Sequence, residues 1–479
     1  MVSKGKLHAI LFPIPHPGHI NPSINFALKL ALRGFVVTYV NLEFVHHQLK
    51  SKSQATEDID IFSEARKSGL DIRHTTVSDG LPLEFNRVFH LEDYWEHMLV
   101  NFPAHADEVV GRIIHADPYL LHFLVADTFY GWSATVANKY NIANVSFWTE
   151  PALVYSLIRH SELLRENGHF PCKDNVAEEI TYIPGIKTVH TKDFMPYLKE
   201  SDVETTSYKL VFTAFKEESK ADFVLHNTVY ELESETLSGL SKYKPHYAIG
   251  PINFSKGLPT NTVSKSLNPE TDCSQWLASK TPSSVLYVSF GSLVQTSKRN
   301  IEEIAYGLLL SEVKFIWVVR AGMAEDEEAT VLPDGYEDEI QDKGLIVPWC
   351  NQLRVLEDPA VGGFLTHCGW NSVLESMWFG VPMICYPVDY DQPTNRKLVI
   401  DDWQIGINLC DGTSLERKEI ADKIRFLMDR SVSKDINENA TSVKEKMRSA
   451  VEIDGSSERN FNQFIRDLRA KIDSTGTTK

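Results

Sequence analysis

Runs of apolar residues alternate with amphipathic segments along most of the chain, which predicts parallel strands connected by helices. The first apolar run covers residues 7–14. A turn rich in proline and glycine follows, then a helix over about 21–33 and a second strand, FVVTYVNL. Further strands are predicted near 70–76, at 122–127, just before SFWT, and within 221–233 and 246–252. This order predicts a doubly wound sheet in the first half of the chain.

The second half repeats this logic with a strand at 284–292, a helix at about 300–310 and the strand VKFIWVVR. Between the halves, residues 253–275 are rich in Ser, Thr, Asn, Pro and Lys with little periodicity, which is typical of a linker. Helices are predicted near 392–403, 415–429, 433–452 and 457–471. The pattern therefore predicts an α/β protein with two Rossmann-like domains facing a cleft. Their predicted bounds are 1–252 and 276–455, with a final helical segment at 456–479.

Length and charge narrow the class of protein. The 479 residues suit two domains, and 48 basic against 65 acidic residues give a formal charge of −17. This balance argues against nucleic acid or an anionic membrane as the main partner. The N-terminal apolar run is too short for a signal peptide, and no stretch has the apolar length of a membrane span. Six cysteines without a CxxC pair predict reduced thiols in a cytoplasmic protein.

Two residues of the first half predict an acid–base pair. His19 lies between the end of the first strand and the following predicted helix, whose positive terminus would keep the imidazole neutral near pH 7. Asp127 ends the fourth strand, which in the sheet order 3-2-1-4-5 lies beside the first. The carboxylate would then orient the imidazole. Each residue taken alone is more typical of a turn or a cap.

The segment 349–392 predicts a second site. It contains a strand (361–365), a polar turn (366–369), a helix (370–379) and another strand (382–386). His367, Asn371 and Ser372 surround the helix N-terminus, where unpaired N–H groups favour a phosphate. Trp349 is available for stacking on a ring, and Glu375 for sugar hydroxyls. The alternative for each residue is structural: Ser372 and Glu375 also form a capping box, and the His and Trp side chains suit a core.

This segment resembles the signature box of the plant family 1 UDP-dependent glycosyltransferases, with HCGWNS, the following Glu, GVP and the terminal DQ in place. Asn351 stands where that family usually has Pro, so the fixed φ of proline is lost there. The resemblance implies the GT-B fold, in which the last helix crosses back onto the first domain. It also implies roles for individual residues.

His19 would be the catalytic base and Asp127 its partner. Trp349 would stack on uracil, and the diphosphate would lie at the helix N-terminus. The residues implied for UDP are Ser292, Trp349, Cys350, Gln352, His367, Asn371, Ser372 and Glu375, and those for the sugar are Thr149, Trp370, Asp391 and Gln392. Trp148 and Tyr390 would line the acceptor pocket, with core packing an equal alternative for Trp148.

The implied activity is inverting transfer of glucose from UDP-glucose to a small-molecule acceptor, such as a plant phenolic or terpenoid, giving a β-O-glucoside. Gln392 favours glucose. No cofactor or metal is expected, although Asp389-Tyr390-Asp391 spells D-x-D, and the protein is expected to be a monomer. The alternatives are a UDP-sugar epimerase or hydrolase and a non-catalytic UDP-sugar binder. A nicotinamide-dependent oxidoreductase is disfavoured because GxGxxG is missing.

Overall fold

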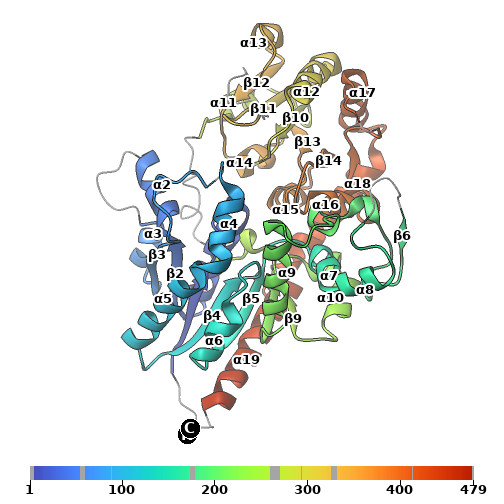
Figure 1. The fold of residues 1–479 in the computed structure, drawn as a ribbon. Coiled ribbons are helices and arrows are strands. Elements are labelled where there is room, and N and C mark those ends of the chain that lie inside the picture. The colour runs from blue at the N-terminus through green and yellow to red at the C-terminus, as the bar shows by residue number, and fades with distance from the viewer. Residues whose placement is uncertain are drawn as a thin grey trace.

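A computed structural model describes residues 5–53, 60–87, 89–172, 178–258, 270–292, 294–324, 332–412 and 414–476. Part of the predicted linker, at 259–269, lies outside these ranges, as do residues 325–331. The described chain forms two parallel sheets, each covered by helices (Figure 1). Across the described ranges, no helix has the length and apolar character needed to cross a bilayer.

The first sheet has seven parallel strands in the order β3-β2-β1-β4-β5-β8-β9. The predicted order 3-2-1-4-5 is thus confirmed and extended by two strands. Apolar side chains cover both faces of the sheet, which explains why its strands are continuous hydrophobic runs. The strand bounds are β1 (Leu7–Phe12), β2 (Val36–Leu42), β3 (Ile72–Val77), β4 (Leu121–Asp127), β5 (Ala143–Trp148), β8 (Phe223–His226) and β9 (His246–Ala248).

The second sheet has six parallel strands in the order β12-β11-β10-β13-β14-β15. Its strands are β10 (Val285–Ser289), β11 (Lys314–Val318), β12 (Gly344–Val347), β13 (Val361–Thr366), β14 (Met383–Cys385) and β15 (Gly406–Asn408). A separate hairpin pairs β6 (Glu179–Ile180) with β7 (Val189–His190). The two large sheets agree with the expectation of two Rossmann-like domains.

Helices of the first half are α1 (Pro17–Leu32), α2 (Glu43–Ser53), α3 (Ser63–Lys67), α4 (Leu91–Val100), α5 (Phe102–Ala116), α6 (Ser133–Lys139), α7 (Ala152–Arg159), α8 (Ser161–Glu166), α9 (Thr206–Glu218) and α10 (Ser234–Leu240). Short 3-10 turns are η1 (Thr191–Asp193), η2 (Pro196–Leu198), η3 (Tyr230–Leu232) and η4 (Ile252–Phe254). The predicted start of the first helix at residue 21 is wrong, because Pro17 occupies the first turn of α1, where a missing N–H costs no hydrogen bond. His19 therefore belongs to this turn.

Helices of the second half are α11 (Ser274–Ala278), α12 (Lys298–Ser311), α13 (Tyr336–Ile340), α14 (Gln352–Glu357), α15 (Trp370–Phe379), α16 (Gln392–Lys397), the π-helix η5 (Leu398–Asp402), α17 (Arg417–Met428), α18 (Lys434–Ala450) and α19 (Ser456–Gly476). In Figure 1, α19 runs along the first sheet. Phe461, Phe464 and Leu468 of this helix lie in the core of that sheet. The domain boundaries themselves stay predictions.

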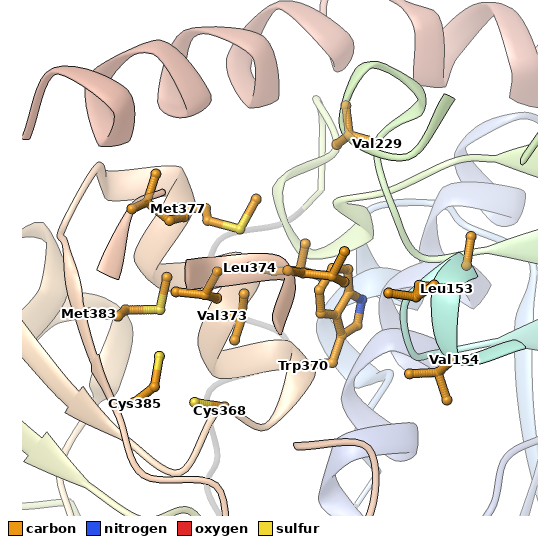
Figure 2. Close-up of a cluster of buried hydrophobic side chains, with 14 of the residues drawn as sticks. Leu153, Val154, Val229, Cys368, Trp370, Val373, Leu374, Met377, Met383 and Cys385 are labelled. Atoms are coloured by element: carbon orange, nitrogen blue, oxygen red, sulfur yellow. The ribbon is translucent and has the colours of Figure 1, made fainter. Parts of the chain in front are cut away.

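One apolar cluster joins the two halves. Figure 2 shows Leu153 and Val154 of the first half beside Trp370 of α15, with Leu374 on the other side of the indole. Val229 of the first half belongs to the same cluster. The Trp370 indole N–H donates to the Asn227 carbonyl oxygen at 2.8 Å. Because burial of apolar surface is the main favourable term in association, this cluster fixes how the two sheets face each other.

Candidate functional site

The carboxyl ends of β1 and β4 bring the predicted acid–base pair together. Phe12 of β1 pairs with Ala126 of β4, so Asp127 follows next to the loop that leads into α1. His19 Nδ1 lies 2.7 Å from Asp127 Oδ2 and 2.9 Å from Thr149 Oγ1. The other Asp127 oxygen accepts the Phe129 N–H at 3.1 Å, which fixes the carboxylate. The ring nitrogen Nε2 is thereby left to face a reactant.

The pKa of His19 differs from the sequence expectation. Burial lowers this pKa, but the carboxylates of Asp127 and Asp391 outweigh burial and raise the pKa above its ordinary value. The expectation that the helix terminus alone keeps His19 neutral is therefore corrected, because two nearby carboxylates stabilise the imidazolium. This arrangement makes His19 a stronger base than an isolated imidazole.

The residues predicted for the uridine lie in a connected network. The Gln352 amide nitrogen lies 3.0 Å from Ser372 Oγ and donates to Glu375 Oε2 at 2.7 Å. The Tyr287 hydroxyl donates to Gln352 Oε1 at 3.2 Å and lies 3.6 Å from Cys350 Sγ. Burial raises the pKa of Glu375 to about 7. These contacts hold the Glu375 carboxyl at the first turns of α15.

The backbone at position 351 has a proline-like conformation, although this chain has Asn where the resembled family usually has Pro. Asn351 has φ −76°, within the range that proline imposes. Its side chain accepts the Arg354 N–H at 3.2 Å and caps α14. Trp349, which precedes it by two residues, is partly buried against the core, and its carbonyl accepts the Thr271 N–H at 2.8 Å. A capping hydrogen bond thus replaces the missing ring of proline.

The turn between β13 and α15 contains the residues predicted for the anion site. Gly369 precedes the helix without a side-chain cap, so the first N–H groups of α15 are not occupied by a capping side chain. Burial lowers the pKa of His367 to about 4, so the imidazole is neutral. Its Nδ1 is buried and has no hydrogen-bond partner within the described ranges. Asn371 donates to the Gly18 carbonyl at 2.9 Å, which connects this turn to the loop of His19.

Two glycines leave room for the His367 ring. A Cβ atom placed on Gly291 or on Gly369 would lie 2.5 Å from His367 Nε2. Gly291 also has φ +72°, which disfavours any other residue. Ser292 follows in the same turn after β10. The glycine turn and the imidazole therefore pack as one unit.

Gly291→Ala is expected to weaken UDP-glucose binding about 10–100-fold, because the new methyl group would displace His367 from the anion site. Binding would be measured by titration calorimetry, with unfolding followed separately. Gly335→Ala is the matched control, since Gly335 has the same φ of +72° but no heavy atom within 4 Å of its added Cβ. Equal losses in the two variants would mean that backbone strain, not the imidazole contact, sets the effect.

The residues predicted for the sugar divide into two groups. Asp391 lies close enough to His19 to raise its pKa, and burial raises the pKa of Asp391 itself to about 6. Gln392 is 3% exposed, and its side-chain oxygen Oε1 accepts the Val388 and Asp389 N–H groups at 2.8 and 3.0 Å. The side chain of Trp370, by contrast, is buried in the cluster of Figure 2. The indole is therefore a core group, and the prediction that Trp370 contacts the sugar stays a prediction, carried by its backbone N–H at the start of α15.

The two residues predicted for the acceptor pocket also differ. Trp148 is 1% exposed, and its indole N–H donates to the Pro151 carbonyl at 2.8 Å. This contact favours the core alternative, because a fully buried ring does not line an open cavity. Tyr390 is 46% exposed and lies beside Asp391.

Sequence reasoning missed Arg320, which follows β11. Its Nε donates to the Gly291 carbonyl at 2.9 Å, and Nη1 donates to the Gly322 carbonyl at 3.1 Å. The guanidinium positions the glycine turn and adds positive charge near His367, whose pKa it lowers further. A basic residue directly after a buried strand was the signal available in the sequence.

Comparisons with known proteins bear on this site. Residues 244–437 match the family model of UDP-glucoronosyl and UDP-glucosyl transferases. UDP-glycosyltransferase 86A1 of Arabidopsis thaliana is 46% identical over 474 residues, covering 98% of this chain and 96% of the relative.

Two solved structures share the fold. One is Medicago truncatula UGT71G1 complexed with UDP-glucose, with a TM-score of 0.81 and 26% identity over 98% of this chain and 99% of that one. The other is Phytolacca americana UGT2 complexed with UDP-2-fluoro-glucose and pterostilbene, with a TM-score of 0.76 and 25% identity over 98% of this chain and 100% of that one. These matches confirm the GT-B fold. The chain belongs to the plant UDP-dependent glycosyltransferases, and it is an enzyme of that class.

Proposed function

We propose that the protein transfers glucose from UDP-glucose to a hydroxyl group of a small apolar acceptor, with inversion at the anomeric carbon. The observation that carries this proposal is the His19–Asp127 pair, in which His19 Nδ1 lies 2.7 Å from the carboxylate. Asp391, from the second half of the chain, is close enough to raise the pKa of His19. The base and the predicted sugar site thus face each other across the cleft. Medicago truncatula UGT71G1, which resembles the chain over nearly its whole length, was crystallised with UDP-glucose.

In the proposed reaction, His19 Nε2 accepts the proton of the acceptor hydroxyl. The hydroxyl oxygen attacks C1 of the α-linked glucose from the face opposite the diphosphate. The bond between C1 and the diphosphate oxygen breaks with its electron pair on UDP. The α15 N-terminus, His367 and Ser292 would stabilise that charge, with Trp349 and Glu375 holding the nucleoside. The product is a β-O-glucoside.

Apolar side chains near His19 favour an apolar acceptor, and Phe129 links them to a small apolar pocket. Trp95, Met98, Phe129 and Leu210 are among its lining residues. The Phe129 ring lies edge-on to the His19 ring with 5.8 Å between centroids. We expect the carbon frame of a phenolic or terpenoid alcohol to pack against the Phe129 ring, with its hydroxyl toward His19. Phytolacca americana UGT2, a structural relative, was crystallised with pterostilbene.

The proposal is tested by UDP release from UDP-glucose across phenols, terpenoid alcohols and carboxylic acids, in the presence of EDTA. Turnover with a β-glucoside as product is the expected result, and turnover in EDTA would support the prediction that no metal takes part. UDP-glucose binding without any transfer would favour a non-catalytic binder, and a changed sugar without an acceptor would favour an epimerase or hydrolase.

A monomer in the cytoplasm remains part of the proposal; none of the six cysteines forms a disulfide within the described ranges.

Glu375 is expected to make UDP-glucose binding depend on pH. Its pKa of about 7 in the free protein means that part of the carboxyl is protonated at neutral pH. Ribose hydroxyls donate best to the ionised form, so binding lowers this pKa and releases a proton. Affinity should therefore rise with pH up to about 7 and then level off, while it falls by up to tenfold per pH unit below 7.

UDP-glucose suits this measurement because its diphosphate has no proton that titrates near pH 7. Calorimetry between pH 5.5 and 8.5 would follow the dissociation constant in the wild type and in Glu375→Gln. The variant is expected to bind more weakly at high pH and to lose the pH dependence. Glu162→Gln is the control, because the side chain of Glu162, on α8, is 76% exposed. An unchanged pH dependence in Glu375→Gln would assign the titration to another group.

A further inference from the structure

The turn between β5 and α7 carries a carboxyl group that the proposed reaction does not use. Glu150 follows Thr149, whose hydroxyl contacts His19. On its other side the backbone is fixed, because the Trp148 indole donates to the Pro151 carbonyl at 2.8 Å. The N–H groups of Ala152 and Leu153 donate to the Glu233 carboxylate at 3.0 and 2.8 Å. Glu150 is therefore held beside the base by a rigid turn.

One carboxyl oxygen of Glu150 is buried and forms no hydrogen bond within the described ranges. Its Oε2 is shielded from solvent and has no hydrogen-bond partner in the described part of the chain. The same holds for the hydroxyl of Tyr197, in η2. A buried polar atom without a partner costs about 1–3 kcal/mol. The two groups lie within electrostatic reach of each other and of Asp391. Together they indicate a binding function, because one ligand would satisfy both.

The segment that carries Tyr197 is fixed to the opposite domain. The Thr394 hydroxyl donates to the Asp193 carbonyl at 2.6 Å, and Arg396 forms an ion pair with the Asp193 carboxylate. Both partners lie on α16, the helix that Asp391 precedes. Tyr197 is thereby positioned on the side of the cleft where the sugar residue Asp391 lies.

The charges around Glu150 select the chemistry of its ligand. Burial, Asp391 and Asp127 together raise the pKa of Glu150 well above its ordinary value. Burial, followed by Glu150 and Asp391, raises the pKa of Tyr197 in the same way. Both groups are therefore neutral and can each donate and accept a hydrogen bond. A neutral hydroxyl matches this pair, whereas an anion would meet the carboxylates nearby.

We propose that Glu150 and Tyr197 form a subsite that hydrogen-bonds a hydroxyl group next to the point of transfer. The hydroxyl belongs either to the acceptor, as a second hydroxyl, or to the transferred sugar. This inference rests on the proposed glucosyl transfer and adds a specificity determinant to it. It predicts that the enzyme discriminates between substrates that have this hydroxyl and substrates that lack it.

The test compares matched pairs of substrates in the wild type, Glu150→Leu, Glu150→Gln and Tyr197→Phe. One pair is an acceptor diol and the corresponding mono-alcohol, and the other is UDP-glucose and UDP-xylose, which lacks the 6-hydroxymethyl group. Glu150→Leu and Tyr197→Phe are expected to lower kcat/KM about tenfold for one hydroxyl-bearing member only. Glu150→Gln should keep most of the discrimination, because the amide also donates and accepts. The affected pair identifies the source of the hydroxyl.

Tyr119→Phe and Glu162→Gln are matched controls on side chains that are largely exposed. Equal losses for both members of every pair, or no change in any variant, would overturn the subsite. Binding of each pair is also measured by calorimetry, which requires no turnover. A failed glucosyl transfer would appear in the wild type, whereas a failed subsite would appear only as unchanged discrimination in the variants.

Discussion

His19→Ala is expected to lower kcat for a hydroxyl acceptor by about 10²–10⁴-fold, because no other group accepts the proton of the attacking oxygen. The proposed UDP site is formed by the second half of the chain, so the dissociation constant of UDP should change little. The measurement is steady-state UDP release with saturating UDP-glucose, together with calorimetric binding of UDP. His115→Ala, on α5, is the control, since its ring contacts only the helix carbonyl of Gly111 among the hydrogen bonds of the described chain.

A second, independent test of His19→Ala compares a carboxylic acid with an alcohol as the acceptor. A carboxylic acid is ionised near neutral pH and has no proton for His19 to remove, so His19→Ala should affect it far less than an alcohol. For the alcohol, kcat/KM of the wild type should rise with pH through the pKa of His19, which lies above its ordinary value because of Asp127 and Asp391. Full activity of His19→Ala on an alcohol would contradict the proposed mechanism.

The segment 349–392 was predicted well because its information is local. The helix predicted at 370–379 matches α15 (Trp370–Phe379) residue for residue. Alternating polar and apolar positions and the glycine before the helix sufficed for this result. The Asp127 contact with His19 was also predictable, since the common doubly wound order 3-2-1-4-5 places the fourth strand beside the first.

Contacts between distant segments could not be predicted in this way. The 2.9 Å contact of Thr149 with His19 and the Arg320 contact with the Gly291 carbonyl depend on how loops from different strands meet. Trp370 shows the same limit, because its indole packs against the first half of the chain and donates to the Asn227 carbonyl. Periodicity indicates that a side chain is buried, but not which surface covers it.

Asp127→Asn is expected to lower kcat for a hydroxyl acceptor by about 10²–10⁴-fold, although the change adds no volume. The carboxylate accepts the proton of His19 Nδ1, which leaves Nε2 able to accept the proton of the acceptor. An asparagine amide can instead donate to Nδ1, which places the proton on Nε2 and blocks the base. Losing the negative charge also removes a cause of the raised pKa of His19, so the rise of kcat/KM with pH should move to lower pH.

Combining the variants tests whether Asp127 acts through His19. The double variant His19→Ala/Asp127→Asn should be no slower than His19→Ala alone, because an orienting carboxylate has no effect without the ring that it orients. Losses that multiply would mean that Asp127 contacts the reactants by itself. Asp422→Asn, with a side chain 60% exposed on α17, is the control for the loss of a negative charge.

Thr149 adds a further distinction. Its hydroxyl lies 2.9 Å from His19 Nδ1 and accepts the proton in the fraction of Asp127→Asn molecules that keep it on Nδ1. Asp127→Asn should therefore retain more activity than Asp127→Asn/Thr149→Val.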